Sequence, residues 1–465
     1  MIEEATHTKH AAGDRPPGPA GAFLIGSLSA FRDDPMAFLE NNAKTYGDIA
    51  FFRFMGLPVY QVNNPDDVRK VLVDPEGIFT KGDILEGFRP LVGTGILLSE
   101  GEAHKKKRRM MAPAFHHGRI RAYGDTMVEE ALRLRETWHD GEAVDMAEEM
   151  NRLTLAIAAR TLFGTDVSAR EGAAVSAALK AFARWYHQST HPLGRLLQLF
   201  PTEATVAFRQ GKRDLSAVVN RMIRARRKGG DAGDILSMLV FAKDAEGDRP
   251  RPDSDSAAFS DAEVHDEAIT LLVAGHETTG AALAWAFHLL SEHPEAADRL
   301  AREVREAIGD RLPTVADLPR LGYVEGVFAE ALRFYPAALT LPRQATRDVK
   351  LGGYTVPKGS IVLAAAYCTH RDARFFPEPL AFRPERWQEV PRKDRPKMSY
   401  FPFGGGARTC IGEAFAWMEG TLVLATLASQ FRARSATGHR VEAESLFTVR
   451  PKGGLPMVLE ARALP

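Results

Sequence analysis

The sequence feature that most constrains the fold is one long helix predicted between Ser260 and His293. The run Ser260-Asp261-Ala262-Glu263 is a capping box that begins the helix, and Pro294 ends it. The middle of the helix, from Ala268 to Leu290, is almost wholly apolar. A helix that is apolar on every side has to be buried. We therefore expect it to cross the core of a mostly helical protein.

A polar run interrupts this apolar helix and reads Ala274-Gly275-His276-Glu277-Thr278-Thr279. Burying polar groups without a purpose is costly. The Thr278 hydroxyl can bond back to the carbonyl of Ala274, which bends the helix and opens a notch. One interpretation is a packing kink with a self-satisfied threonine. The other is a functional notch, in which the small residues leave room for a planar cofactor and a diatomic ligand.

Near the C-terminus a single cysteine lies behind three consecutive glycines. Residues 403–412 read F-G-G-G-A-R-T-C-I-G, and a helix-forming run, Glu413 to Phe431, follows at once. The positive end of a helix lowers the pKa of a thiol, so Cys410 is predicted to be a thiolate. The glycines allow the backbone to approach a bulky planar group closely. A phosphate cradle is disfavoured because no G-K-[ST] follows, and axial ligation of haem iron is favoured.

The decapeptide resembles the haem-binding signature of the cytochrome P-450 superfamily of haem-thiolate monooxygenases. The resemblance extends over nearly the whole chain from Pro16 onward, with four motifs in the family's order. It implies the cytochrome P-450 fold, which is mainly α with a smaller β-rich part (α+β) and has a long central helix over the haem. We expect residues 1–15 to be a flexible N-terminal segment and residues 16–465 to form a single catalytic domain.

The resemblance also implies the roles of individual residues. Cys410 ligates the iron, and Glu277 and Thr278 form the acid-alcohol pair that relays protons to dioxygen. Haem contacts are implied for His104 (where many relatives have tryptophan), Arg108, Ala274, Gly275, Arg343, Phe403, Gly404, Arg408, Cys410 and Gly412. A triad that we interpret as holding the thiolate loop in place consists of Glu330, Arg333 and Arg386. The candidates for an apolar substrate pocket are Phe88, Leu91, Ala274, Leu339 and Phe447. Residues 184–199 resemble the family's mobile lid.

The run His104-Lys105-Lys106-Lys107-Arg108-Arg109 opens another predicted helix. Neighbouring residues are about 100° apart around a helix, so most of these cations are expected to be solvated. His104 and Arg108 are one turn apart, and the family binds haem propionates with residues at this spacing. The lysines and Arg109 are candidates for docking an acidic electron-transfer protein.

Composition excludes several other classes of function. The 465 residues have a formal net charge of +0, so nothing global indicates a nucleic acid or an anionic membrane as partner. The stretch Met1 to Asp14 has no apolar span, which predicts neither a signal peptide nor a membrane anchor. With only 2 cysteines, Cys368 and Cys410, a disulfide framework is not expected. We expect a monomeric cytoplasmic protein in which Cys368 is a buried core thiol.

The resemblance implies a monooxygenase that uses haem b and O2. It inserts one oxygen atom, by hydroxylation or epoxidation, into an apolar, lipid-like substrate such as a fatty acid, a terpenoid or a carotenoid. Because the chain ends soon after the cysteine loop, electrons are expected to come ultimately from NAD(P)H through a separate ferredoxin or flavodoxin-type reductase system. The alternatives are a haem-thiolate sensor or gas-binding protein and a peroxide-driven haem enzyme, although peroxide-using relatives usually lack the acid-alcohol pair. An electron-transfer haem protein is disfavoured, because Ala274 and Gly275 leave an open site.

Overall fold

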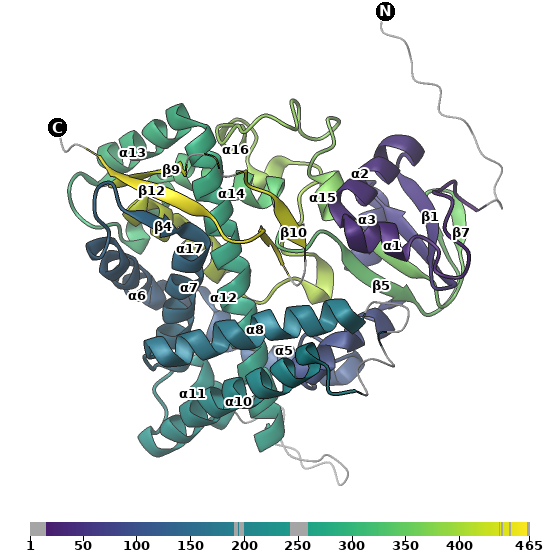
Figure 1. The fold of residues 1–465 in the computed structure, drawn as a ribbon, viewed down its shortest axis with the longest axis horizontal. Helices are drawn as coiled ribbons and strands as arrows, with labels where there is room; N and C mark the ends of the chain where they lie inside the picture. Colours follow the sequence, from purple (N-terminus) through teal and green to yellow (C-terminus); the bar gives the residue numbers. More distant parts are fainter. Residues whose placement is uncertain are drawn as a thin grey trace, which may run out of the picture. The chain divides into compact units, whose positions relative to one another are not determined.

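The computed structural model describes residues 15–189, 194, 200–241, 259–436, 438, 440–445 and 448–462. These residues form two compact units (Figure 1). The sheet unit comprises Met1–Ile84, Thr340–Pro377 and Pro396–Arg408, and the helical unit comprises Leu85–Leu339, Glu378–Arg395 and Thr409–Pro465. The expected α+β class is confirmed. A flexible segment over residues 1–15 falls outside the described residues except for Arg15, and a single domain over residues 16–465 stays a prediction.

A five-stranded sheet in the order β1-β2-β8-β5-β3 forms the centre of the sheet unit. Its strands are β1 (Ile49–Phe54), β2 (Leu57–Val62), β3 (Phe79–Thr80), β5 (Leu341–Ala345) and β8 (Ile361–Ala364). Successive strand side chains point to opposite faces. One face packs on α3 (Pro65–Val73), and the other packs on α1 (Leu28–Asp33) and α2 (Pro35–Tyr46). The smaller elements of the unit are β6 (Val349–Leu351), β7 (Tyr354–Val356), α15 (Ala366–Thr369) and η5 (Gly406–Arg408).

Cys368 lies in the short helix α15, directly after β8, and is 8% exposed. Burial raises the pKa of this thiol to about 12. The prediction of a buried core thiol is confirmed.

The helical unit contains most of the chain. Its helices are α4 (Arg89–Val92), α5 (Gly101–Met111), α6 (His117–Glu136), α7 (Met146–Phe163), α8 (Ala169–Ser189), α10 (Glu203–Gly229), α11 (Ile235–Phe241), α12 (Asp261–Glu292), α13 (Pro294–Ile308), α14 (Gly322–Phe334), α16 (Arg386–Glu389) and α17 (Glu413–Leu427). Its 3-10 turns are η2 (Ala112–Phe115), η3 (Val315–Arg320) and η4 (Arg392–Asp394), and η1 (Asp83–Phe88) lies at its boundary. A sheet in the order β4-β12-β9 is made of Ala143–Asp145, Pro456–Ala461 and Phe431–Ser435, and β10 (Ala443–Ser445) pairs with β11 (Val449–Pro451).

Helix α12 is the central element of the helical unit, as the sequence predicts. It packs against α7, α10, α14 and α17, and Figure 1 shows it beside α7 and α17. The capping box is present: the Ser260 hydroxyl accepts from the Glu263 amide at 3.3 Å, and the Glu263 carboxylate accepts from the Ser260 amide at 2.9 Å. Among the described residues, no helix combines the length and the apolar character needed to cross a membrane.

Candidate active site

The cysteine loop ends at a helix N-terminus, as predicted. Cys410 is exposed, Gly412 is the N-cap of α17, and the helix begins at Glu413. It ends at Leu427, before Phe431, which begins β9 instead of closing the helix. A side chain at Gly412 would place its Cβ 3.9 Å from the Cys410 sulfur, within van der Waals contact. An exposed thiol at the positive end of a helix can bind a group from outside the protein as its anion.

Helix α5 is hydrogen-bonded to this loop. The Arg108 guanidinium donates to the carbonyl of Thr409, the residue before Cys410, at 2.7 Å. His104, one turn earlier on α5, is buried. The two residues predicted to bind propionates therefore lie on the helix that contacts the cysteine loop.

Most of the cations in this run are at least partly exposed, as expected, and Lys107 is the exception. Its side chain is 6% exposed, and its ammonium lies 2.9 Å from the carboxylate of Glu267 on α12. The physical reason is that this face of α5 meets a buried carboxylate, which no local pattern reveals. Lys105 and Arg109 are exposed.

The long buried helix α12 is open at one position in its middle, Ala274. The Thr278 hydroxyl donates to the carbonyl of Ala274 at 2.7 Å, as predicted. Ala274 is exposed and Thr278 is half-buried, although residues 271–273 and 276–277 are buried. Gly275 lies against α7, where an added Cβ would be 3.5 Å from Leu162. Because protein interiors are close-packed, an exposed alanine in the middle of a buried helix marks real space. The exposed Cys410 thiol suits a metal of a planar cofactor, and the small, exposed Ala274 suits the space that a small ligand needs.

Glu277 points into the protein and is 8% exposed. Its Oε1 accepts a hydrogen bond of 3.1 Å from the hydroxyl of Thr448. Burial raises the pKa of the Glu277 carboxyl, while the charge of Arg450 and the Thr448 hydrogen bond oppose the rise. A carboxyl with a raised pKa can hold a proton closer to neutral pH and deliver it as a general acid. Sequence reasoning missed Thr448 and Arg450, because no short-range signal connects them to α12.

Glu330, Arg333 and Arg386 meet as the resemblance implies, and all three side chains are at most 3% exposed. Arg333 donates to both oxygens of Glu330, at 2.9 and 2.8 Å. Arg386 adds a bond of 3.0 Å, and the indole of Trp387 adds one of 2.9 Å. Such a multiply bonded carboxylate compensates the buried charges. Trp387 is a fourth member that sequence reasoning missed, although it directly follows Arg386.

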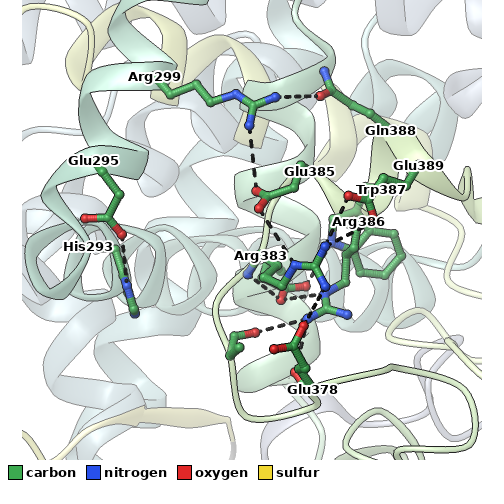
Figure 2. A network of polar contacts seen from close by, with 12 residues as sticks. His293, Glu295, Arg299, Glu378, Arg383, Glu385, Arg386, Trp387, Gln388 and Glu389 are labelled. Carbon is green, nitrogen blue, oxygen red and sulfur yellow. Dashed lines mark hydrogen bonds and ion pairs between the residues drawn. The ribbon is translucent and has the colours of Figure 1, made fainter.

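Surface ion pairs lie near Arg386 and Trp387 of this cluster, as Figure 2 shows. Arg383 lies 2.8 Å from Glu378 and 3.1 Å from Glu389, and its backbone amide donates to Glu330 at 3.1 Å. Arg299 on α13 lies 4.0 Å from Glu385. These contacts join the segment that carries Arg386 to helices α13 and α14. That the triad holds the thiolate loop in place stays a prediction.

Four of the predicted haem contacts lie in the sheet unit. Arg343 is 6% exposed and donates to the carbonyl of Pro342 at 2.9 Å. Phe403 and Arg408 are half-buried. Gly404 has a φ of 75°, which favours glycine. Their roles toward a haem stay predictions.

The predicted pocket residues are mostly enclosed. Phe88 packs on the ring of Tyr186 at a centroid distance of 4.8 Å, and Leu91 and Leu339 are buried. Ala274 is the exposed member among the described candidates. Phe447 lies outside the described residues, and so do residues 190–193 and 195–199 of the expected lid.

Comparisons with known proteins agree with these observations. The family model described as Cytochrome P450 matches residues 16–455. Cyclooctatin synthase of Streptomyces melanosporofaciens is 36% identical over 447 residues, which are 96% of this chain and 95% of that protein. Cyclooctat-9-en-7-ol 5-monooxygenase of the same organism is 35% identical over 96% of this chain and 95% of its own. Pentalenene oxygenase of Streptomyces avermitilis is 30% identical over 96% of this chain and 97% of its own.

Proposed function

Because the chain belongs to the cytochrome P450 family, we propose that Cys410 would bind the haem iron as a thiolate and that Glu277 and Thr278 deliver protons during oxidation of a terpenoid-like substrate. Family membership gives the reaction class: the protein is a haem-thiolate monooxygenase that uses haem b, O2 and electrons from NAD(P)H through redox partners. The observation that carries the site assignment is the exposed Cys410 thiol at the N-terminus of α17.

The residues around the cysteine suit a haem. Haem b, when bound, supplies the redox chemistry that activates O2. His104, Arg108, Arg343 and Arg408 are the proposed donors to its carboxylates. Phe403, Gly404 and Gly412 belong to the loop that would hold it, and Ala274 and Gly275 belong to the helix that would cover it.

Proton delivery is assigned to two adjacent residues of α12. The Thr278 hydroxyl donates a hydrogen bond to the carbonyl of Ala274, so its oxygen can still accept one. An acceptor there can hold an O–H group or a water molecule in place. The Glu277 carboxyl, whose pKa is raised by burial, is the source of the proton.

The relatives support the choice of substrate class. Their names state oxidation of pentalenene and of cyclooctat-9-en-7-ol. Among a fatty acid, a terpenoid and a carotenoid, we infer a terpenoid that is held by Phe88, Leu91, Ala274, Leu339 and Phe447. We also propose that the protein is a monomer, that it is cytoplasmic, and that it receives electrons from a ferredoxin or flavodoxin-type partner. The exposed Lys105 and Arg109 on α5 support docking of an acidic electron carrier.

The test begins with the reduced, carbon monoxide-bound protein. We expect its Soret band at the long-wavelength position of thiolate ligation, and we expect that band to be lost in Cys410→Ser. Thr278→Ala should consume NADPH with release of peroxide in place of product. A matched control is Thr270→Ala, because the buried Thr270 on the same helix bonds back to the carbonyl of Asp266 at 2.7 Å in the same way.

Further outcomes separate the candidate functions. Unchanged coupling in Thr278→Ala would contradict the relay and favour a sensor or gas-binding protein. A screen of terpenoid, fatty acid and carotenoid probes for a low-spin to high-spin shift of the haem tests the substrate class. A shift with fatty acids alone would overturn the terpenoid assignment.

A further inference from the structure

The carboxyl of Glu277 is bound by a residue far away in the sequence. The Thr448 hydroxyl lies 3.1 Å from Glu277 Oε1, and the two residues are 2% and 8% exposed. A threonine hydroxyl can donate to a carboxylate and can also accept from a protonated carboxyl. Thr448 can therefore hold the Glu277 side chain in both of its protonation states.

Thr448 is itself held firmly against α12. It directly precedes strand β11, whose first residue, Val449, accepts a hydrogen bond of 2.9 Å from the indole of Trp285 on α12. The Val449 amide donates to the carbonyl of Ala337 at 3.1 Å. The Trp285 ring is stacked on Tyr335 at a centroid distance of 3.7 Å. The strand that follows Thr448 is thus tied to the same helix that carries Glu277, which fixes the Thr448 hydroxyl relative to the carboxyl.

The hairpin of β10 and β11 also supplies the charge that acts on Glu277. Arg450 on β11 lies opposite Glu444 on β10, and the two side chains form an ion pair of 2.8 Å. Among the described residues, Arg450 is the charged group whose field lowers the pKa of Glu277, and burial is the larger, opposing effect. Thr448 and Arg450 both favour the carboxylate form. The hairpin therefore adjusts how readily Glu277 releases its proton.

We propose that Thr448 is a positioning residue that holds the Glu277 carboxyl for proton delivery. This inference rests on the proposed function of Glu277 as the proton source. Thr448 neither gains nor loses a proton in the cycle: the proton leaves the Glu277 carboxyl toward Thr278 and is replaced from solvent. The role of Thr448 is to limit the orientations of the carboxyl and to stabilise its anion after the proton has left.

The test compares Thr448→Val, which keeps the shape but removes the hydroxyl, with Thr448→Ser, which keeps the hydroxyl. In Thr448→Val we expect the product formed per NADPH to fall roughly fivefold, the factor that the loss of one ordinary hydrogen bond gives. Thr448→Ser should form as much product per NADPH as the wild type. Thr161→Val controls for a buried threonine made apolar, because Thr161 on α7 is 2% exposed and bonds only within its own helix in the described part of the chain.

A second measurement does not depend on turnover. The infrared carbonyl band of the protonated Glu277 carboxyl is followed in the ferric holoenzyme during a pH titration and is identified by its loss in Glu277→Gln. The hydrogen bond from Thr448 lowers the pKa of Glu277. Without it, the midpoint of the Glu277 titration should move to higher pH in Thr448→Val, and in Thr448→Ser it should equal the wild-type midpoint.

The outcomes distinguish the inference from the function on which it rests. If Glu277→Gln leaves coupling unchanged, the proposed role of Glu277 fails. If Glu277→Gln uncouples the enzyme but Thr448→Val matches the wild type in coupling and in the infrared midpoint, the role of Thr448 is overturned. Equal uncoupling in Thr448→Val and Thr448→Ser without a shifted midpoint would also overturn it, because packing alone would then explain the loss.

Discussion

Lys107 of α5 and Glu267 of α12 form a buried ion pair of 2.9 Å, with side chains 6% and 0% exposed. The second oxygen of Glu267 accepts from the backbone amide of Ile96 at 2.9 Å, and the Lys107 ammonium donates to the carbonyl of Thr94 at 2.7 Å. Burial raises the pKa of Glu267, and the charge of Lys107 opposes the rise. The pair thus joins α5, which contacts the cysteine loop, to the helix that carries the proposed proton relay.

Removing the cation of this pair should be costly. Lys107→Met leaves the Glu267 carboxylate buried without its counter-charge, so we expect a loss of about 3–5 kcal/mol in the free energy of unfolding. Adding Glu267→Met to the same chain should recover most of that loss. The control is Lys105→Met, since Lys105 pairs with Glu102 at an exposed position, and we expect a change of less than about 1 kcal/mol. Denaturant unfolding of the holoenzyme measures all three, and equal effects of the two lysine variants would refute the prediction.

On α14, too, removing a buried charge should cost far more stability than removing an exposed one. Glu330→Gln removes the anion between Arg333 and Arg386 and leaves two buried guanidinium groups facing each other, so we expect about 3–5 kcal/mol of destabilisation. If the triad is structural, haem content should fall while the Soret position of the remaining carbon monoxide complex stays unchanged.

The matched control on the same helix is Glu325→Gln. Glu325 is 39% exposed and pairs with Arg392 at the surface. We expect its loss to cost less than about 1 kcal/mol. A moved Soret band in Glu330→Gln would show that Glu330 acts on the thiolate directly and would contradict the structural role.

The elements that sequence predicts well are those with local signals. The capping box at Ser260 and the stop at Pro294 place both ends of α12, and the back-bond from Thr278 follows from helix geometry alone. The cysteine at a helix N-terminus follows from a glycine loop before a helix-forming run. In each case the responsible residues lie within a few positions of one another.

What sequence misses depends on contacts between distant segments. Lys107 has the same local chemistry as Lys105 and Lys106, and only the position of Glu267 on α12 makes it buried. Thr448, beside strand β11, contacts Glu277 directly, and no sequence motif predicts this contact. The four-residue helix that carries Cys368 has no sequence signal either, because such a short segment has no resolvable periodicity.

Cys368 should be unreactive in the folded protein. Burial raises the pKa of Cys368 from the ordinary 9.0 to about 12, so its thiolate fraction near neutral pH falls about a thousandfold. Iodoacetamide should therefore leave Cys368 unmodified in the native holoenzyme and modify it rapidly after unfolding, as measured by peptide mass spectrometry. Cys368→Ala should retain the long-wavelength Soret band. Fast native modification of Cys368 would contradict its placement in the core of the sheet unit.

The final prediction concerns the imidazole next to the proposed proton source. His276 on α12 is 2% exposed, and burial lowers its pKa from 6.5 to about 4. Between these two values the unfolded chain binds a proton that the folded protein does not, so the stability due to the neutral imidazole is fully present above pH 6.5 and is lost as the pH falls toward 4. From pH 6.5 to pH 5 this loss amounts to about 2 kcal/mol in the free energy of unfolding.

In His276→Gln that share of the acid sensitivity should disappear, because the amide does not titrate. Denaturant unfolding of the holoenzyme at a series of pH values between 7 and 5 measures the slope of the free energy of unfolding against pH. The control is His139→Gln, at an exposed position, which should keep the pH dependence of the wild type. If His276→Gln shows the wild-type slope, the imidazole is protonated within the folded protein, and its buried neutral state beside Glu277 is refuted.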